Sequence, residues 1–437
     1  MLPRRPRPAE CAWAAVASLL LSTSPAWASG GPLSLGEALR LAVAQSPELA
    51  AQHALAEGAS VGVVAAGALP DPKLKATLDN LPTTQDVAWT VKDPATMLKI
   101  GLSQEIPGGN KLELRTRRAR LDAQRESVMV EAQRAAVQRD VAMAWVARRY
   151  AAEADAAVVE EIGEAQLAVE AGSAQYRAGK ASQTDLIVLQ GAVVELKNRR
   201  TEIGVQVRRA QIALARFIGA DAERPLGDAP DLGRMPPAVT DGIGTDEFPA
   251  VKVARAQEMV AATDADLAQA EYWPDWKVEL SYGWRGRSPI VDLPFQAPSG
   301  GLRYSQVVSL EVTIDLPLFT STRQGPRHAA KLKELDAARA LREEAKRRQA
   351  AEVQGMVAEW ESARAQARRI KDELIPLAIQ RREAATAAYS GGIGSLGAAL
   401  EARRAELDAR LSLVQMEQAA AKAWAWLAFV YPVTEPL

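Results

Sequence analysis

Apolar residues recur every seven positions along most of the segment from Asn110 to Ile218, which is rich in Ala, Arg, Glu and Gln and is interrupted once, at 176–182. Residues of these types lose little side-chain freedom in a helix. A strict seven-residue repeat is typical of a coiled-coil seam rather than of the wider apolar stripe on a globular helix. The pattern predicts two helical rods, 110–175 and 183–218, which at 1.5 Å per residue are roughly 95 Å and roughly 55 Å long.

The second half of the chain repeats this plan, with predicted rods at 324–388 and 396–430 and a break between them. One constant shift of the numbering also sets Gly163 opposite Pro376, two poor helix formers, which predicts a bend at the same height in both halves. The same shift aligns the residues of the two breaks, namely Tyr176, Gly179 and Ser182 with Tyr389, Gly392 and Ser395.

Four shorter segments alternate between apolar and polar residues, which is the pattern of a strand with two different faces. The predicted strands are 73–80, 97–107, 276–284 and 304–317. Each pair of strands follows an Ala-rich helix, the first opened by the Ser34-x-x-Glu37 pattern of a capping box and running to about Gly67. The candidate residues of the polar face, which would line the lumen of a barrel, are Lys99, Lys277, Glu279, Glu311 and Asp315.

The order of elements is therefore helix, strand, strand, long helix, long helix, stated twice. We divide the chain into a signal peptide (1–28), a first structural repeat (29–220), a linker (221–246) and a second structural repeat (247–431). The predicted fold class is mainly α with a small β part, in which a long α-helical coiled-coil barrel is joined to a transmembrane β-barrel with four strands per subunit.

The N-terminus has the form of a secretory signal peptide. Three arginines precede an apolar run from Ala12 to Leu21, and Ala26-Trp27-Ala28 is a small-x-small cleavage site. The single cysteine, Cys11, lies inside this signal, so thiol chemistry and cysteine metal ligation are not expected in the mature protein. The 53 basic and 54 acidic residues nearly cancel, which argues against nucleic acid as a partner.

Two strands per half are too few to close a barrel, and open strand edges are costly in lipid. We therefore expect other subunits to complete the sheet. The strands are long enough for tilted membrane strands, and Trp276, Tyr282 and Trp284 are suited to the aromatic girdles at a lipid boundary. A soluble sheet packed on a helix explains the alternation equally well, but not its position at the end of such long rods.

These features together resemble the TolC-like outer-membrane factor family. The resemblance rests on the duplicated strand pairs, the two Tyr-x-x-Gly-x-x-Ser breaks and the segment from Gln104 to Lys111, and it covers essentially the whole mature chain. That segment and the opening Leu35–Leu39 are most similar to the heavy-metal branch, the CzcC-like and CusC-like components. The resemblance implies a homotrimer with a twelve-stranded barrel in the Gram-negative outer membrane and a helical tunnel in the periplasm.

No enzyme is predicted, and we expect no catalytic residue, no cofactor and no metal site. His53 and His328 each stand alone on a predicted helix, and the chain contains no metal-ligand spacing, phosphate-binding glycine loop or Ser-His-Asp arrangement. If the system moves metals, their recognition is then expected to reside in its partners.

The two helix breaks are candidates for function, because the resemblance places them where a periplasmic adaptor (membrane fusion protein) docks. The candidate docking residues are Tyr176, Arg177, Gly179, Lys180, Ser182, Tyr389, Gly392, Gly394 and Ser395. Asp185 is a candidate gate carboxylate with Arg177 as a partner, although a solvated surface charge is an equally good interpretation.

The function expected from the sequence is an exit duct of a tripartite efflux system of the resistance-nodulation-division (RND) type, fed by an inner-membrane pump. We expect it to export heavy-metal cations such as cobalt, zinc, cadmium, copper or silver. A drug or polypeptide export duct of the same fold and a soluble periplasmic coiled-coil adaptor or spacer remain as alternatives.

Overall fold

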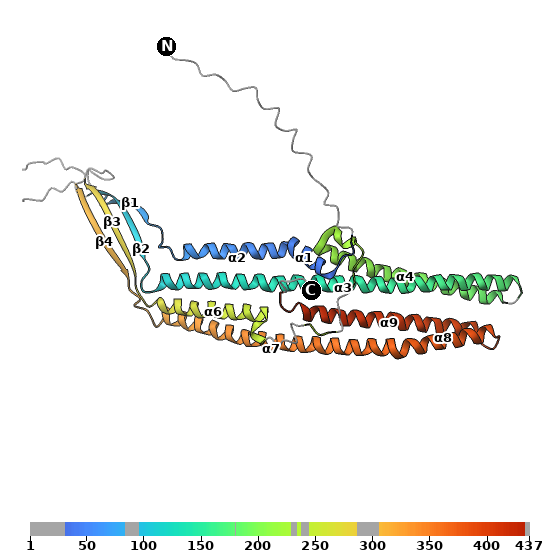
Figure 1. The fold of residues 1–437 in the computed structure, drawn as a ribbon. Helices are drawn as coiled ribbons and strands as arrows, with labels where there is room; N and C mark the ends of the chain where they lie inside the picture. The colour runs from blue at the N-terminus through green and yellow to red at the C-terminus, as the bar shows by residue number, and fades with distance from the viewer. Residues whose placement is uncertain are drawn as a thin grey trace, which may run out of the picture.

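The computed structural model describes residues 31–83, 96–179, 181–228, 234–236, 244–285 and 306–432. The predicted signal peptide and Lys180 lie outside the described residues. The molecule is elongated, with a β-sheet at one end and two helical turns at the other (Figure 1). A mostly helical chain with one small antiparallel sheet is the fold class that the sequence predicts.

The two halves of the chain share the order helix, strand, strand, long helix, long helix, with one extra helix in the first half and a π-helical interruption in the second. The first half consists of α1 (Leu35–Gln45), α2 (Pro47–Ala66), β1 (Lys73–Asp79), β2 (Met97–Ile106), α3 (Lys111–Arg177), α4 (Gln183–Ile218) and the short helix η1 (Gly219–Glu223). The second half consists of the short helix η2 (Thr245–Glu247), α6 (Pro249–Ala270), β3 (Asp275–Arg285), β4 (Gln306–Asp315), α7 (Gln324–Arg369), η3 (Ile370–Leu374), α8 (Ile375–Ser390) and α9 (Leu396–Ala428).

The helices form a wall whose neighbours change halfway along its length. Near the sheet, α2 packs on α3, α3 on α6 and α6 on α7 (Figure 1). Toward the other end α3 packs against α4 and α9 instead of α2 and α6, and it lies between them. The 67 residues of α3 span about 100 Å of this wall as one uninterrupted helix.

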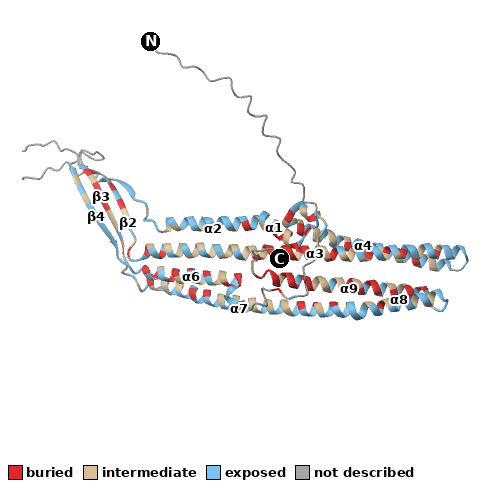
Figure 2. Cartoon of the chain, viewed as in Figure 1, coloured by how far each residue is buried: buried red, intermediate tan, exposed pale blue. Residues whose placement is uncertain are grey.

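The largest apolar core lies midway along the molecule, where α1 and the last turns of α4 and α9 surround α3 (Figure 2). Trp145 on α3 is fully buried, and its indole N–H donates to the carbonyl of Leu33 at 3.1 Å. Leu33 also pairs with Leu226 in an isolated parallel bridge, and Arg224 lies 2.8 Å from the carboxylate of Glu37. These contacts tie the segment before α1 to the segment after α4.

The sheet is antiparallel throughout, in the order β1-β2-β3-β4, so the strand pairs of the two halves join through β2 and β3. Its polar face is crowded: Ser103, Glu279 and Ser281 are buried, and a Cβ on Gly101 would lie 2.9 Å from Cβ of Ser281. Its apolar face is open, with side chains between 40% and 77% exposed. They are Leu74, Leu78, Leu98, Ile100, Leu102, Ile106, Trp276, Leu280, Trp284, Val308, Leu310, Val312 and Ile314.

The halves also meet at the junction between the sheet and the rods. Gly108 approaches the second half so closely that a Cβ there would lie 1.6 Å from the carbonyl oxygen of Pro274. Its N–H donates to the carboxylate of Asp275 at 2.7 Å. The ammonium of Lys111 donates to the same carboxylate at 2.7 Å and to the carbonyl of Trp273 at 2.8 Å. The segment from Gln104 to Lys111, whose similarity to the heavy-metal branch was noted above, therefore holds the two halves of this chain together.

One expectation about helix continuity is wrong. The first helix does not run unbroken to Gly67, because Pro47 has no N–H to continue α1; Ser46 caps α2 instead, accepting from the N–H of Leu49 at 3.2 Å. At the two positions of the predicted bends the halves differ in helix type: α3 is continuous through Gly163, whereas a π-helical turn at 370–374 precedes Pro376 in the second half.

Candidate functional site

The first turn at the free end of the rods joins α3 to α4. Gly179 has a φ of 72°, which favours glycine. The hydroxyl of Ser182 accepts from the N–H of Asp185 at 3.1 Å, and the carboxylate of Asp185 accepts from the N–H of Ser182 at 3.2 Å. Asp185 thus completes a capping box, while Arg177 donates to the carbonyl of Ser173 at 3.4 Å. Both candidate gate residues lie at the turn, but each side chain binds a different partner.

The second turn joins α8 to α9 and is built in a similar way. Gly392 has a φ of 76°, and the hydroxyl of Ser395 accepts from the N–H of Ala398 at 3.2 Å. Gly394 fits tightly against the end of α8, since a Cβ there would lie 2.9 Å from Cβ of Ala388. Ile393 at the tip is 89% exposed. The turn therefore presents an apolar side chain to solvent on a backbone of small residues.

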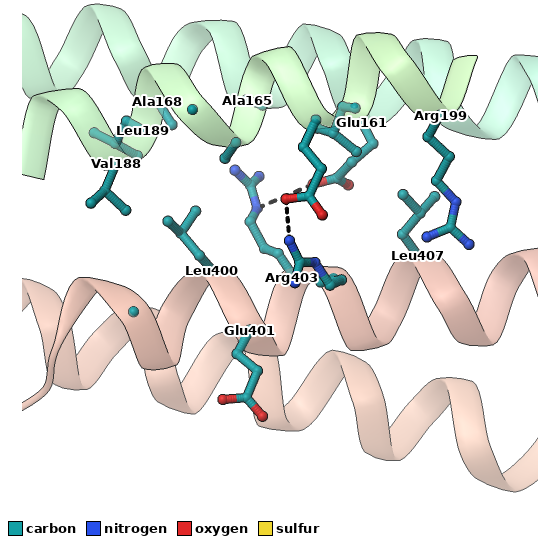
Figure 3. Close-up of a pocket in the computed structure, with 16 residues that line it drawn as sticks. Glu161, Ala165, Ala168, Val188, Leu189, Arg199, Leu400, Glu401, Arg403 and Leu407 are labelled. Atoms are coloured by element: carbon teal, nitrogen blue, oxygen red, sulfur yellow. Dashed lines mark hydrogen bonds and ion pairs between the residues drawn. The ribbon is translucent and has the colours of Figure 1, made fainter. Parts of the chain in front are cut away.

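An open groove of about 590 Å³ separates α4 from α9, and a second of about 570 Å³ continues it toward the turns. Small residues of α3 form the floor; they include Ala165, Ala168 and Ala171. Figure 3 shows Val188 and Leu189 on the α4 side and Leu400 on the α9 side of the groove. Tyr389 lies along the part near the turns.

Ion pairs cross this groove and join α9 to the α3–α4 hairpin. Arg403 contacts two carboxylates of α3 at once, and its guanidinium lies 3.7 Å from Glu161 (Figure 3). The pairs are Arg403 with Glu161 and Glu164, Arg404 with Glu195, Arg410 with Glu160, and Asp408 with Arg199. The two hairpins are held together here by charge as well as by the Val158 and Leu407 apolar cluster.

The ionic cluster extends below the groove to α8. Glu406 is 4% exposed and is held by Arg382 at 3.1 Å and by Arg410 at 2.7 Å. Burial raises the pKa of Glu161 above its usual range, and the charge of Arg403 opposes that rise. Arg410 stabilises the same carboxylate less than Arg403 does, so the joint is most sensitive to the loss of Arg403.

Sequence reasoning missed these joint residues and named only the turns and the sheet. The signal was present: Arg403, Arg404 and Glu406 flank the seam leucines Leu400 and Leu407, which is where coiled coils place interhelical ion pairs. The structure places every described candidate docking residue at one of the two turns.

The five candidate lumen residues lie on the polar face of the sheet. Lys99 pairs with Asp79 at 2.5 Å, and Glu279 accepts from Lys75 at 3.3 Å. The face therefore carries charges of both signs, which suits a hydrated path better than a binding site.

The described residues contain no group of three or more His, Cys, Asp and Glu side chains placed to hold a metal ion. In the same part of the chain, no helix combines the length and the apolar character needed to cross a membrane.

The fold of this chain is similar to those of several solved outer-membrane proteins. VceC, an outer membrane protein from Vibrio cholerae, is 18% identical with a TM-score of 0.70, covering 91% of this chain and 96% of that chain. The CmeC outer membrane channel of Campylobacter jejuni is 15% identical with a TM-score of 0.73, covering 91% and 85%. CusC is 15% identical with a TM-score of 0.75, covering 91% of both chains. A search among curated protein sequences found no similar protein.

The family model described as "Outer membrane efflux protein" matches residues 38–220 and 246–431. These ranges follow the two structural repeats and leave out the segment between them. The match spans far more than half of the sequence, and the chain belongs to the outer membrane efflux protein family.

Proposed function

We propose that three copies of this chain form the outer-membrane exit duct of a tripartite efflux system of the RND type, which exports heavy-metal cations. The observation that carries the proposal is the inverted sheet, in which a continuous face of apolar side chains is exposed while polar residues of the two central strands, Ser103, Glu279 and Ser281, are buried. Such a sheet is stable only where its apolar face meets a nonpolar environment, and the hydrocarbon core of a bilayer provides one.

The dimensions of the sheet support a membrane location. β3 has 11 residues, which is the length of a tilted membrane strand. Trp276 and Trp284 lie on its apolar face eight positions apart, or about 26 Å at the rise of a strand. Aromatic girdles flank an apolar band about 25 Å tall in outer-membrane barrels.

The free edges of the sheet support a trimer. Within the described chain β1 pairs only with β2, and β4 only with β3. Unpaired edges are costly in lipid, and joining the sheets of three copies removes them all. The helical wall below would then close into a tunnel, with the two turns of each copy at its periplasmic mouth.

The turns are the proposed docking surface for a periplasmic adaptor. Each turn presents small residues around a glycine with positive φ, and the groove between the hairpins opens toward them. An incoming helical hairpin with small or aliphatic residues at its tip fits this shape. The proposed gate, at Asp185 and Arg177, lies at the same mouth.

Membrane fractionation tests the location. We expect the protein in the outer membrane as a trimer that runs intact on gels and dissociates on heating. Recovery in the soluble periplasm would reject the duct and favour the spacer.

The exported substrate needs a separate test. The segment 104–111 carries the similarity to the heavy-metal branch, but its residues Gly108 and Lys111 make structural contacts that do not depend on the substrate. We expect a deletion strain to become sensitive to zinc, cobalt, cadmium, copper or silver and to keep its tolerance of organic toxicants. The reverse outcome would assign the duct to drugs.

A further inference from the structure

The two edge strands of the sheet carry opposite charges on the polar face. β1 presents Lys73 and Lys75 there, and β4 presents Glu311 and Asp315. Because β1 and β4 are the unpaired edges, these are the charges that a neighbouring copy meets first.

The acidic edge is unbalanced within one chain. Glu311 lies directly opposite Glu279 of β3, and Asp315 directly opposite Asp275. Like charges that face each other across a strand pair are destabilising. Glu279 is paired with Lys75, and Asp275 with Lys111, whereas Glu311 and Asp315 have no ion-pair partner among the described residues. Lys277 of β3 is diagonal to both carboxylates, and Lys73 of β1 already pairs with Glu105 at 2.6 Å, so a lysine from a neighbouring copy would add to the balance of charge at this edge.

The alternation of faces restricts how β4 of one copy can pair with β1 of the next. Odd-numbered residues form the polar face of both strands, so odd must meet odd. With that condition, only two antiparallel registers pair all seven residues of β1 within β4: Lys73 opposite Thr313, or Lys73 opposite Asp315.

Barrel geometry separates these registers. A rung of the sheet runs from Lys73 through Ser103 and Glu279 to Glu311. With Lys73 opposite Thr313, Glu311 faces Lys75 of the next copy, so the row of facing residues has moved two positions along β1. With Lys73 opposite Asp315, Glu311 faces Thr77, and the row has moved four positions. Over twelve strands spaced about 4.8 Å apart, these displacements give strand tilts of about 19° and about 35°. Membrane barrels have tilts of about 35–45°, which selects the second register.

A further displacement, with Lys75 opposite Asp315, also gives a tilt of about 45°. It leaves Lys73 opposite Pro317, which has no N–H for the ladder, and sets Glu311 against Asp79. Its one favourable charge pair, Lys75 with Asp315, is offset by the repulsion of Glu311 and Asp79, and the loss of pairing at Lys73 disfavours it.

We propose that β4 of each copy pairs with β1 of the next copy with Asp315 opposite Lys73, which places Lys75 between Glu311 and Asp315. This seam rests on the proposed trimer and specifies its register. On the apolar face the seam then pairs Leu74 with Ile314, Ala76 with Val312, and Leu78 with Leu310.

Disulfide trapping reads the register directly. The only natural cysteine is Cys11 in the predicted signal, so Ala76→Cys can be combined in turn with Leu310→Cys, Val312→Cys or Ile314→Cys. Facing residues of a strand pair lie within disulfide reach, and diagonal neighbours do not. After oxidation we expect Ala76→Cys with Val312→Cys to give trimers that survive boiling and dissociate with reductant.

Trapping through Leu310→Cys or Ile314→Cys in an otherwise normal trimer would overturn the register and leave the duct intact. Trapping by none of the three pairs in a normal trimer would reject this seam. Absence of any heat-sensitive trimer in the unmodified protein would instead reject the proposed function.

Discussion

The ammonium of Lys111 lies 2.7 Å from the carboxylate of Asp275 and joins the first turn of α3 to the first residue of β3. Lys111 belongs to the first repeat and Asp275 to the second, so this pair fixes how the two halves leave the sheet together. The Lys111 side chain is 8% exposed, and its other partner is the carbonyl of Trp273.

Loss of the Lys111 charge should weaken this junction. Lys111→Met removes a charge-assisted hydrogen bond and should cost about 1.5–3 kcal/mol in the free energy of unfolding. Lys333→Met, at a side chain that is 84% exposed, is the matched control and should change it by less than about 0.5 kcal/mol. Thermal unfolding followed by helical circular dichroism measures both. Equal midpoints would show that the junction is held by other contacts.

Gly108 should tolerate no side chain. A Cβ would overlap the carbonyl oxygen of Pro274, so Gly108→Ala must displace the backbone where the two halves meet. Gly58→Ala places the same methyl group in open space on α2 and should be neutral or stabilise by up to about 1 kcal/mol. The yield of assembled trimer in membranes compares them. A normal amount of trimer for Gly108→Ala would mean that the backbone around Gly108 shifts at little cost.

The capping box at the first turn predicts how Asp185 acts. If Asp185 serves the helix end, Asp185→Asn and Ser182→Ala should each destabilise the start of α4 by about 1 kcal/mol and produce similar hydrogen exchange at the turn. If Asp185 is also the gate, Asp185→Asn alone should raise the conductance of the duct in planar bilayers. Equal conductance of the two variants would remove Asp185 from the gate.

The ion pairs between α9 and the α3–α4 hairpin predict that Arg403 contributes more to stability than Arg404 does. Arg403→Met removes the nearer of the two arginines that stabilise the half-buried carboxylate of Glu161 and should cost about 2–3 kcal/mol. Arg404→Met breaks a pair with Glu195 in which both side chains are more than half exposed, and should cost less than about 1 kcal/mol. Thermal midpoints of the two variants test the order. An equal or reversed order would contradict a specific role for Arg403.

The same joint predicts a pH dependence. Burial raises the pKa of Glu161, so the folded state binds a proton more readily than the unfolded state, and the contribution of this group to stability falls as pH rises from its ordinary value of 4.5 through the folded value. Arg403, Arg410, Glu164 and Glu406 act on the same group. Glu161→Gln should therefore flatten the fall of the thermal midpoint as pH rises above 4.5. Glu164→Gln keeps the titrating carboxyl of Glu161 and should preserve more of this fall than Glu161→Gln does.

The sequence predicts the repeating elements because their signals are local. Seven-residue spacing around Leu400 and Leu407 identifies a rod, and alternation along β3 and β4 identifies strands whatever they pack against. Pro47 was overlooked as a helix boundary although its chemistry marks it as one. The π-helical turn before Pro376 has no counterpart at Gly163, since a glycine lowers helix preference without removing a hydrogen bond.

The ion pairs between α9 and α3 could not be predicted from the sequence alone. Glu161 and Arg403 lie far apart in the chain, and their contact depends on how α9 packs against α3. Gly108 and Lys111 likewise stand out in the sequence, but their partners are visible only when the second half is in place.

The mass of the purified protein in detergent decides whether three copies form a membrane-embedded duct. We expect a single species with the mass of three mature chains, extracted from outer membranes and kept soluble only by detergent. A protein recovered without detergent with the mass of one chain would contradict it, because the apolar face of the sheet would then have been stable in water.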